Sequence, residues 1–498
     1  MFKQGLQDEF GTLYTWKDDP NSDCFKWMGV ECNNQTGYVQ SLDLQGSETN
    51  YLSGEINPSI TELQHLKYPD PSYLYISSQI PRFILNICTA ETFASDNNNL
   101  SGDFSDFIIH NNYSYCIGNV SSLQVLSLSN NKISAIIGEI PSSIRSLTKL
   151  EMLIMSKNFF KGVITEYHFT NLSKLEYLYL SYNSLTMKVS DDWVPPFQLQ
   201  ELDLSYCNMD SRFPNWLQKQ NNLSFMYLSN VGSLPPTPSW FWGKLQTLVS
   251  MTISNNNLTG RIPNLEINLT NYPEIDLSSN QLEGAIPSFL LQTAALHLSN
   301  SKISDLASFY AKKVSLTFWE GVDQFYKNPD MFLKSIDLSS NHLTGKIPTE
   351  IGYLFGLISL NLSRNNLCGE IISNIGNFKS LEFLDLSRNH LSGRIPSSLA
   401  HIDRLTWLDL SNNQLYGEIP IGTQLQTFDT SSFDGNFNLC GEPLDRKCHG
   451  EDPAEHPVLT IKSGDENSIF LEALYMSMGI GFFTGFIGLV GSILLLPS

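Results

Sequence analysis

Residues 383–396 read FLDLSRNHLSGRIP, and this stretch decides the fold. Three other stretches repeat its spacing: SIDLSSNHLTGKIP at 335–348, SLNLSRNNLCGEI at 359–371 and WLDLSNNQLYGEIP at 407–420. Their equivalent residues Ile336, Leu360, Leu384 and Leu408 are 24 residues apart each time. The shared pattern, L-x-x-L-x-L-x-x-N-x-L at a fixed period, is that of leucine-rich repeats.

Further copies extend the array toward the N-terminus, with spacings of 21 to 27 residues. Their L-x-L motifs begin at Leu126, Leu153, Leu178, Leu202, Met226, Met251, Ile275 and Leu296. Alternate residues of a strand point to opposite faces, so both apolar residues of L-x-L enter the core. One repeat cannot bury this face alone, whereas stacked repeats share one core and one parallel sheet. The sequence therefore predicts a β-dominated leucine-rich repeat solenoid.

An asparagine completes most copies of the motif. At this position an inward amide can hydrogen-bond the backbone of the turn and continue from repeat to repeat as a ladder. Cys207 replaces the asparagine in one copy, which favours a buried structural thiol over a reactive one. The asparagines are Asn131, Asn158, Asn183, Asn256, Asn280, Asn341, Asn365, Asn389 and Asn413.

Two regions interrupt the array, residues 63–122 and 302–334. In the first, Pro69 and Pro71 occupy both inward strand positions, and proline cannot donate a hydrogen bond to a sheet. We therefore expect an irregular repeat there, with Asn99 and Leu100 restoring partial register. The second region is too long for one repeat and lacks the motif.

The two ends of the sequence favour different topologies. Residues 473–496 carry no charge and are long enough to cross a bilayer, which predicts one transmembrane helix. On that helix Gly481 and Gly485 form a G-x-x-x-G pair, with Ser477 and Gly488 near the same stripe, as expected for helix association. Residues 1–10, MFKQGLQDEF, contain no apolar signal-peptide core, so external repeats would require a signal that this stretch does not encode.

Composition and motifs restrict the possible functions. A net charge of −20 argues against nucleic acid as a partner. The sequence contains none of the phosphate-loop, kinase or hydrolase motifs that we looked for, so we expect neither an enzyme nor a cofactor. Cys440 and Cys448, with His449 and His456, fit no common zinc spacing, and a capping disulfide explains the two cysteines better.

The remaining cysteines and the Asn-x-Ser/Thr sequons bear on the compartment. Cys24 and Cys32 could pair with each other, whereas Cys88, Cys116 and Cys368 have no obvious partners. The sequons favour a glycosylated ectodomain, although an Asn-rich repeat also produces some by chance. They lie at Asn34, Asn99, Asn112, Asn119, Asn171, Asn222, Asn257, Asn268 and Asn361.

Three long stretches carry a family resemblance. DDWVPPFQLQELDLSYCNMDSRFPNWLQKQNNL at 191–223, IPIGTQLQTFDTSSFDGNFNLCGEPLDRKC at 419–448 and the segment 467–498 resemble plant receptor-like proteins, in particular the group of fungal-xylanase receptors and Cf-type resistance proteins. The resemblance implies a plant-type repeat ectodomain, a curved right-handed superhelix with its parallel sheet on the concave side. It also implies a single membrane helix, no kinase domain and signalling through partner kinases.

The resemblance also implies the division of the chain. The cap departs from the family pattern, because DCFKWMGVEC at 23–32 has Phe25 where the family has a cysteine and two of four cap cysteines are missing. The chain is therefore expected to be a copy shortened at both ends. The expected parts are a partial cap (1–38), repeats (39–301, degenerate at 63–122), an island (302–334), repeats (335–430), a C-terminal cap (431–449), an acidic juxtamembrane segment (450–472), the membrane helix (473–496) and a stub (497–498).

Two surfaces are candidates for binding. Outward aromatic residues in the middle repeats suit ligand contact, although aromatic residues also simply favour strands. They are Tyr177, Tyr179, Tyr182, Tyr206, Phe225 and Tyr227. The resemblance implies that the last repeats contact a co-receptor kinase, with Asn361, Arg364, Asp385, Arg388, Trp407 and Asp409 as candidates.

The sequence favours a single-pass plasma-membrane receptor-like protein with its repeats outside the cell. Its expected partners are an extracellular peptide, protein or glycan ligand, adaptor and co-receptor kinases with leucine-rich repeats, and the membrane. The resemblance places it in plant defence. A developmental receptor-like protein, a soluble polygalacturonase-inhibitor-like protein and a non-functional or decoy fragment are the alternatives.

Overall fold

The computed structural model describes residues 5–17, 23–47, 51–74, 89–103, 122–134, 140–210, 213–234, 236–306, 309, 333–422 and 424–448. These residues belong to one compact unit, Met1–Cys448. Most of segment 302–334, the acidic segment 450–472 and the expected membrane helix, with Ser477, Gly481, Gly485 and Gly488, lie outside the described residues. No helix within the described ranges is both long and apolar enough to cross a membrane.

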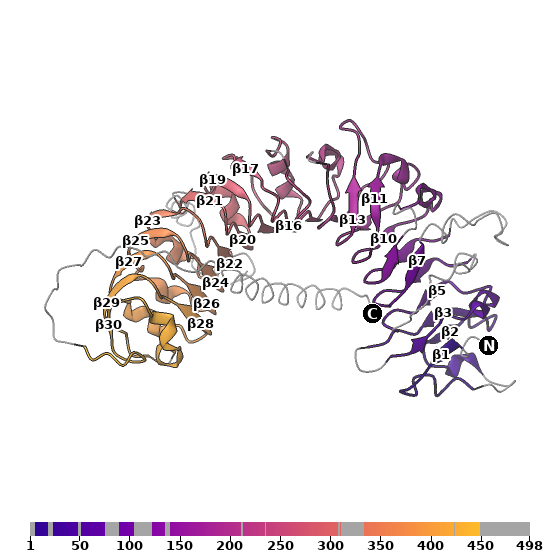
Figure 1. Cartoon of the computed structure of the whole chain (residues 1–498), viewed down its shortest axis with the longest axis horizontal. Helices are drawn as coiled ribbons and strands as arrows, with labels where there is room; N and C mark the ends of the chain where they lie inside the picture. The colour runs from indigo at the N-terminus through magenta and orange to yellow at the C-terminus, as the bar shows by residue number, and fades with distance from the viewer. Residues whose placement is uncertain are drawn as a thin grey trace. The chain divides into compact units, whose positions relative to one another are not determined.

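The repeats form the parallel sheet that their spacing predicts, with its strands stacked in sequence order (Figure 1). Within the described ranges this sheet has thirteen strands, and twelve of them are centred on the twelve inward residues identified in the sequence. The strands are β6 (Thr92–Ala94), β8 (Val125–Ser127), β10 (Met152–Ile154), β12 (Tyr177–Tyr179), β14 (Glu201–Asp203), β15 (Phe225–Tyr227), β16 (Ser250–Thr252), β18 (Glu274–Asp276), β20 (Ala295–His297), β22 (Ser335–Asp337), β24 (Ser359–Asn361), β26 (Phe383–Asp385) and β28 (Trp407–Asp409).

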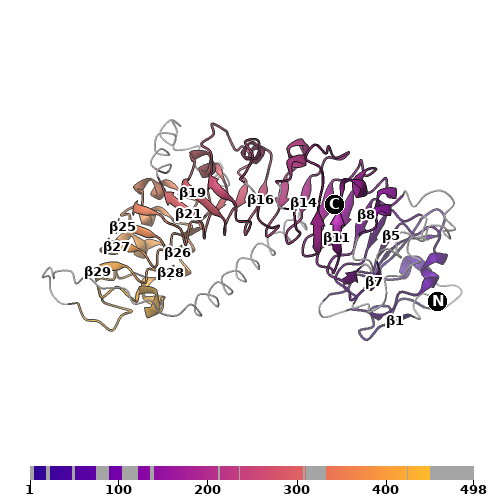
Figure 2. The same cartoon turned by 45° about the horizontal axis from the view of Figure 1, so that its top comes forward.

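A second set of short parallel sheets follows the turn of most repeats, though, among the described residues, not those of β14 and β15, and Figure 2 shows β25, β27 and β29 in a row apart from β26 and β28. Their recurring glycine has positive φ, as at Gly393 (φ 87°), where an added Cβ would also lie 2.7 Å from Cγ of Glu370. These strands are β7 (Ser101–Asp103), β9 (Lys132–Ser134), β11 (Lys161–Ile164), β13 (Ser184–Met187), β17 (Thr259–Arg261), β19 (Gln281–Ala285), β21 (Lys302–Asp305), β23 (Thr344–Lys346), β25 (Asn366–Glu370), β27 (His390–Gly393), β29 (Gln414–Glu418) and β30 (Asn438–Cys440).

Short 3-10 helices return the chain to the next strand and bury apolar residues such as Leu399, which is fully buried. Several of them follow the proline of the G-x-I-P step, whose fixed φ suits a helix start. The helices are η2 (Cys24–Lys26), η3 (Pro58–Glu62), η6 (Ser142–Ser146), η7 (Glu166–Phe169), η8 (Asn215–Lys219), η9 (Phe241–Gln246), η10 (Ser288–Gln292), η12 (Thr349–Tyr353), η13 (Ile375–Asn377), η14 (Ser397–His401), η15 (Leu425–Thr427) and η16 (Thr430–Phe433).

The predicted asparagine ladder is present. The amide of Asn389 donates to the carbonyl oxygens of Leu362 (2.9 Å) and Leu386 (3.1 Å), and its oxygen accepts the N–H of Leu367 (3.0 Å). One buried side chain thus joins its own turn to the preceding repeat. Cys207 occupies the same position with its sulfur 3.2 Å from the carbonyl oxygen of Leu180, and burial raises the pKa of its thiol to about 12. It is therefore a structural thiol, as the sequence indicates.

The N-terminal cap is a small mixed structure. β2 (Val30–Cys32) pairs antiparallel with β3 (Val39–Asp43), and β1 (Leu6–Gln7) pairs antiparallel with β4 (Ser53–Gly54). Cys24 and Cys32 are bonded to each other in this cap, and Cys440 and Cys448 are bonded at the opposite end of the repeats.

The expectation for Pro69 and Pro71 needs correction. β5 (Tyr68–Asp70) is a regular strand that pairs in register with β3, and both prolines are buried. The irregularity lies on the other side, because the hydrogen-bonded ladder stops between β5 and β6. In the preceding repeat Leu44 donates its N–H to Asp70 O (3.0 Å), but Pro71, at the equivalent position, has no N–H to donate toward β6.

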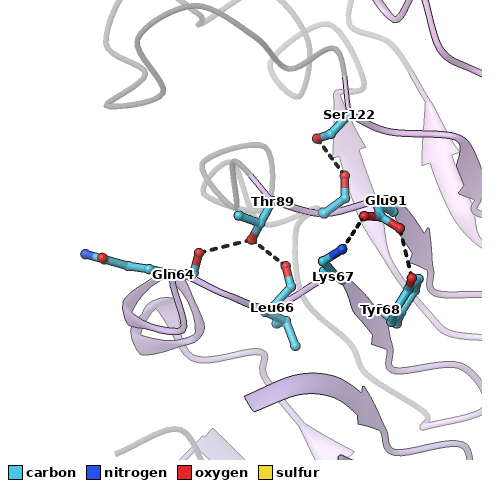
Figure 3. A network of polar contacts seen from close by, with 8 residues as sticks. Gln64, Leu66, Lys67, Tyr68, Thr89, Glu91 and Ser122 are labelled. Atoms are coloured by element: carbon cyan, nitrogen blue, oxygen red, sulfur yellow. Dashed lines mark hydrogen bonds and ion pairs between the residues drawn. The ribbon is translucent and has the colours of Figure 1, made fainter. Parts of the chain in front are cut away.

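Side chains bridge this gap, which we call the β5–β6 seam. Figure 3 shows Glu91, just before β6, accepting hydrogen bonds from the ammonium of Lys67 (2.6 Å) and the hydroxyl of Tyr68 (2.8 Å). Thr89 donates to the carbonyl oxygen of Leu66 (2.7 Å), and the N–H groups of Glu91 and Thr92 both reach Lys67 O. Repeat stacking therefore continues without the strand ladder.

β6 itself is a strand that the sequence analysis missed. Phe93, not a leucine, is its buried central residue. The ladder amide of this repeat is Asn98, which donates to Pro71 O (2.8 Å) and accepts the N–H of Leu74 (3.0 Å). The expectation that Asn99 restores the register was therefore wrong by one residue, whereas Leu100 is buried as expected.

Candidate functional site

The outward aromatic residues of the middle repeats lie on adjacent strands. The register places Tyr177 beside Glu201 and Tyr179 beside Asp203, across β12 and β14. On the next strand, β15, Phe225 and Tyr227 continue the same two rows. The two tyrosines of β12 and the two aromatic residues of β15 are half-buried, because each packs against its neighbours on the sheet face. The sheet thus brings the six sequence-predicted aromatic residues onto three consecutive repeats.

Hydrogen bonds hold the tyrosine rings of β12 in place. The hydroxyl of Tyr177 donates to Oε1 of Gln200 (3.1 Å), and the hydroxyl of Tyr179 donates to the carboxylate of Glu201. Burial, followed by this hydrogen bond, raises the pKa of Tyr179, so its hydroxyl stays protonated at physiological pH. Fixed rings lose little conformational entropy when another molecule covers them, which favours binding.

Tyr182 and Tyr206 form a separate exposed pair at the ends of these strands. Their rings stack with centroids 4.3 Å apart and planes inclined by 20°, and the two side chains are 49% and 43% exposed. The ammonium of Lys157 lies 5.8 Å from the ring centroid of Tyr182, within the range of a cation–π contact. The pair therefore offers an aromatic surface that is compatible with cations.

Both tyrosines adopt left-handed backbone conformations, with φ of 54° and 61°. Bulky residues avoid this region, whereas asparagine tolerates it. The equivalent turn position in other repeats carries Asn130, Asn230 and Asn412 with almost the same φ. The backbone therefore does not explain why tyrosine occupies these two positions.

The column of acidic and amide residues in the last repeats has a structural role. Oδ1 of Asp385 accepts the N–H of Ser387 (2.9 Å), and Oδ1 of Asn361 accepts the N–H of Ser363 (3.1 Å). Asp409 accepts from Ser411 in the same way (2.9 Å). Asn361 and Asp385 are only 5% and 7% exposed, and burial raises the pKa of the Asp385 carboxyl. Their burial removes these two side chains from the expected co-receptor surface.

Other co-receptor candidates are accessible. Trp407 is 53% exposed and stacks on Phe383 of the neighbouring strand, with ring planes inclined by 4°. Arg388 is exposed and Arg364 is half-buried at left-handed turn positions. Phe383 was missed in the sequence, although its place beside the central leucine of β26 marks it as outward.

The sequons divide by exposure. Asn34, Asn171, Asn222, Asn257 and Asn268 are exposed, and Asn99 is half-buried. Asn361 is buried in β24, so the folded repeat leaves no room for a glycan there. Asn112 and Asn119 lie outside the described residues, as do Cys88 and Cys116, while Cys368 is an exposed free thiol on β25.

Comparison with known proteins agrees with the fold. The leucine rich repeat family models match residues 122–147, 148–209, 332–354, 356–378, 380–402 and 404–424. Among solved structures, the plant peptide hormone receptor RGFR1 in complex with RGF2 has a TM-score of 0.57 at 26% identity, covering 79% of this chain and 61% of that one.

Curated relatives narrow the class of protein. Receptor-like protein EIX2 of Solanum lycopersicum is 39% identical over 188 residues, which are 38% of this chain and 17% of that protein. Receptor-like protein EIX1 of the same species is 46% identical over 127 residues, 26% of this chain and 12% of that protein. The chain thus spans less than a fifth of each relative. The chain contains leucine-rich repeats, and these two relatives are plant receptor-like proteins.

Proposed function

We propose that this chain is a plasma-membrane receptor-like protein that binds an extracellular ligand on the aromatic face of β12, β14 and β15. The observation that carries the proposal is one aromatic surface on three consecutive repeats. Tyr177, Tyr179, Phe225 and Tyr227 are held on the sheet face, and the exposed, stacked pair of Tyr182 and Tyr206 continues this surface at the ends of β12 and β14. Aromatic side chains with fixed hydroxyls supply large contact areas at low entropic cost, and such residues dominate binding energies at interfaces.

Signalling would require a second protein. In this proposal, adaptor and co-receptor kinases contact the last repeats, where Trp407 and Phe383 present a stacked aromatic pair beside exposed Arg388. Gly481 and Gly485 of the expected membrane helix would contribute helix contacts with the adaptor. The resemblance to fungal-xylanase receptors supports a role in plant defence. The structural similarity to a peptide hormone receptor supports a developmental peptide as the second candidate ligand.

The experiment replaces Tyr182 and Tyr206 with asparagine, the residue that other repeats place at this turn. Because Tyr182→Asn would create an Asn-Asn-Ser sequon at 182–184, every chain compared also carries Ser184→Ala. Because asparagine suits the left-handed backbone, we expect the double variant to fold and reach the cell surface as the wild-type chain does. The full chain is expressed behind a signal peptide in plant cells, and its oxidative burst is recorded after exposure to fungal culture filtrate and, separately, to plant peptide extract.

The wild-type chain should confer a response to one of the two preparations, and Tyr182→Asn with Tyr206→Asn should reduce that response at least tenfold at equal surface expression. Tyr416→Asn is the matched control, because Tyr416 is equally exposed (44%) but lies on β29 of the second set of sheets. A normal response from the double variant would reject this surface as the ligand site.

A further inference from the structure

Two parallel rows of side chains cross the middle strands. One row contains, in strand order, Tyr177, Glu201, Phe225, Ser250 and Glu274. The other contains Tyr179, Asp203, Tyr227, Thr252 and Asp276. Each row therefore reads aromatic, carboxylate, aromatic, hydroxyl, carboxylate from β12 to β18. The repeated order gives this face a chemical pattern that a ligand could match.

Within the described part of the chain, the four carboxylates of these rows have no cationic partner. Among the residues that the structure describes, no ion pair involves Glu201, Asp203, Glu274 or Asp276. One oxygen of Asp203 accepts the N–H of Ser205 (3.0 Å), and Asp276 is engaged in the same way, but neither contact neutralises the charge. The face thus keeps a negative charge that a positively charged partner would compensate.

The carboxylates also act on the aromatic residue between them. Burial is the main cause that raises the pKa of Tyr227, and the negative charges of Glu201, Glu274 and Asp203 raise it further. Both acidic ends of the rows therefore lie close enough for their fields to meet at β15. A cation bound at β14 would also lie beside the aromatic residues of β12 and β15, which adds a cation–π attraction to the charge attraction. At β18, two strands beyond β15, the charge attraction acts alone.

The spacing of the rows limits the shape of the partner. Neighbouring strands lie about 4.8 Å apart, so the carboxylates of β14 and β18 are separated by three spacings, about 14 Å. An extended peptide advances about 3.4 Å per residue, so four residues cover this distance. Residues i, i+2 and i+4 of such a peptide face the same side.

We propose that the face formed by β14, β15, β16 and β18 binds an extended basic peptide segment with the pattern basic–x–apolar–x–basic. The first basic side chain lies at Glu201 and Asp203, the apolar one at Phe225 and Tyr227, and the second basic one beyond them at β18. This inference rests on the proposed receptor function and adds the chemical class of its ligand. The peptide crosses the strands and does not add a strand to the sheet, because β14, β15, β16 and β18 each already pair with a neighbouring strand on both sides.

The test uses the full chain in detergent and a fluorescent peptide of sequence lysine–serine–phenylalanine–serine–lysine with blocked ends. Two comparison peptides replace both lysines with glutamate or place both lysines side by side. Two pair variants neutralise one end each, Glu201→Gln with Asp203→Asn, and Glu274→Gln with Asp276→Asn. The control, Glu370→Gln with Glu418→Gln, neutralises two exposed carboxylates on β25 and β29.

The lysine peptide should bind at least tenfold more tightly than either comparison peptide, and raising the salt concentration should weaken it. Each pair variant should lose about tenfold in affinity, both together about a hundredfold, and the control variant less than twofold. Each tenfold step corresponds to about 1.4 kcal/mol. Melting temperatures of all variants identify any that fail to fold. The conservative variants Glu201→Asp and Glu274→Asp keep the charge and should bind the lysine peptide more tightly than the neutral pair variants do.

Equal binding of the adjacent-lysine peptide, or unchanged affinity in the fourfold variant, would overturn the inference. Spermine competing as well as the peptide would also overturn it, because it would show a diffuse cation surface. The peptide-binding test and the test of the proposed receptor function can fail independently. If the lysine peptide fails while Tyr182→Asn with Tyr206→Asn still abolishes the cell response, the receptor site stands and only its ligand class is wrong.

Discussion

The β5–β6 seam and the junction between β26 and β28 solve the same stacking problem with different forces. At the second junction the N–H of Leu386 donates to Asp409 O (2.9 Å), and Asn413 donates to Leu386 O (3.0 Å). At the seam the strand ladder is missing, and Asn98 together with the contacts of Glu91 spans the gap. Both junctions nevertheless bury their central residues, Phe93 and Leu384.

The comparison shows that apolar burial keeps repeats stacked, whereas the strand ladder adds to that stacking and is dispensable at one position. Each fully buried apolar side chain contributes about 1.5–3 kcal/mol, but a typical backbone hydrogen bond contributes only about 1 kcal/mol net. Two missing donors are therefore tolerated. The same comparison marks the seam as the place where the repeats from β6 onward would separate most easily from the N-terminal cap.

The largest expected effect comes from removing a ladder asparagine in the intact array. Asn389→Ala leaves the buried N–H of Leu367 without its partner, which costs about 1–3 kcal/mol. It also removes two hydrogen bonds of about 1 kcal/mol each to Leu362 O and Leu386 O, which keep the amides of Asn365 and Asn413, so we expect a loss of about 3 kcal/mol in unfolding free energy. Asn98→Ala at the seam should cost about half as much, because Asn98 is only half-buried and water can replace its contacts. Urea unfolding of both variants measures the difference. Equal losses would contradict the comparison.

Sequence reasoning located twelve inward strand residues because their L-x-L motif recurs at a nearly constant spacing on both sides of the 302–334 interruption. It missed β6, since Phe93 replaces the leucine and the strand lies in the region 63–122, which was expected to be irregular. It assigned Asp385 and Asn361 to a surface because alternation alone cannot show a side chain folding back onto an N–H two residues later. The acidic rows of β14 and β18 were missed too, because only the strand register brings Glu201 and Glu274 into one line.

The second prediction restores the ladder at the seam. Pro69→Leu with Pro71→Leu supplies two N–H donors toward β6, worth about 1 kcal/mol each, while the loss of proline rigidity offsets about 0.4–1 kcal/mol per site. Both prolines are already buried, so little additional apolar burial is gained. We expect a net stabilisation of at most about 1 kcal/mol and slow exchange of the two N–H groups introduced at positions 69 and 71, which would donate to β6. Fast exchange at both positions would mean that the ladder cannot form even with donors present.

The third prediction uses pH to separate the seam from the intact array. Asp96, after β6, is largely buried, and this burial raises the pKa of its carboxyl despite hydrogen bonds from Ser127 and Ser129. A folded-state pKa above the unfolded value means that the stabilisation is complete below the usual Asp pKa and is lost as pH rises through the folded value. Acidification toward pH 4 should therefore protect β6 from exchange.

Asp96→Asn should flatten this pH profile at β6 without altering the profile at β26. Asp385→Asn is the matched variant, because burial also raises the pKa of Asp385 within the intact array, and it should flatten only the profile at β26. Protection factors at both strands from pH 4 to pH 7, in which each exchange rate is compared with the intrinsic base-catalysed rate at the same pH, provide the measurement. A pH dependence at β6 that survives Asp96→Asn would assign the effect to another group, with Asp70 next in line because burial raises its pKa as well.

The smallest effect is expected from the side-chain contacts that bridge the seam. Glu91→Gln removes the charge that pairs with Lys67 but leaves an oxygen that can accept from Tyr68. Ion pairs near the surface, as this half-buried one is, contribute little to global stability, so the unfolding midpoint should move only slightly. Because the ladder is absent here, the loss should appear locally, as a few-fold faster exchange of the Thr92 N–H that reaches Lys67 O.

Glu283→Gln is the control, since it removes the Arg261–Glu283 pair where β17 and β19 keep their ladder, and local exchange there should stay constant. Equal local effects at both places would show that the seam depends on its side chains no more than an ordinary junction does.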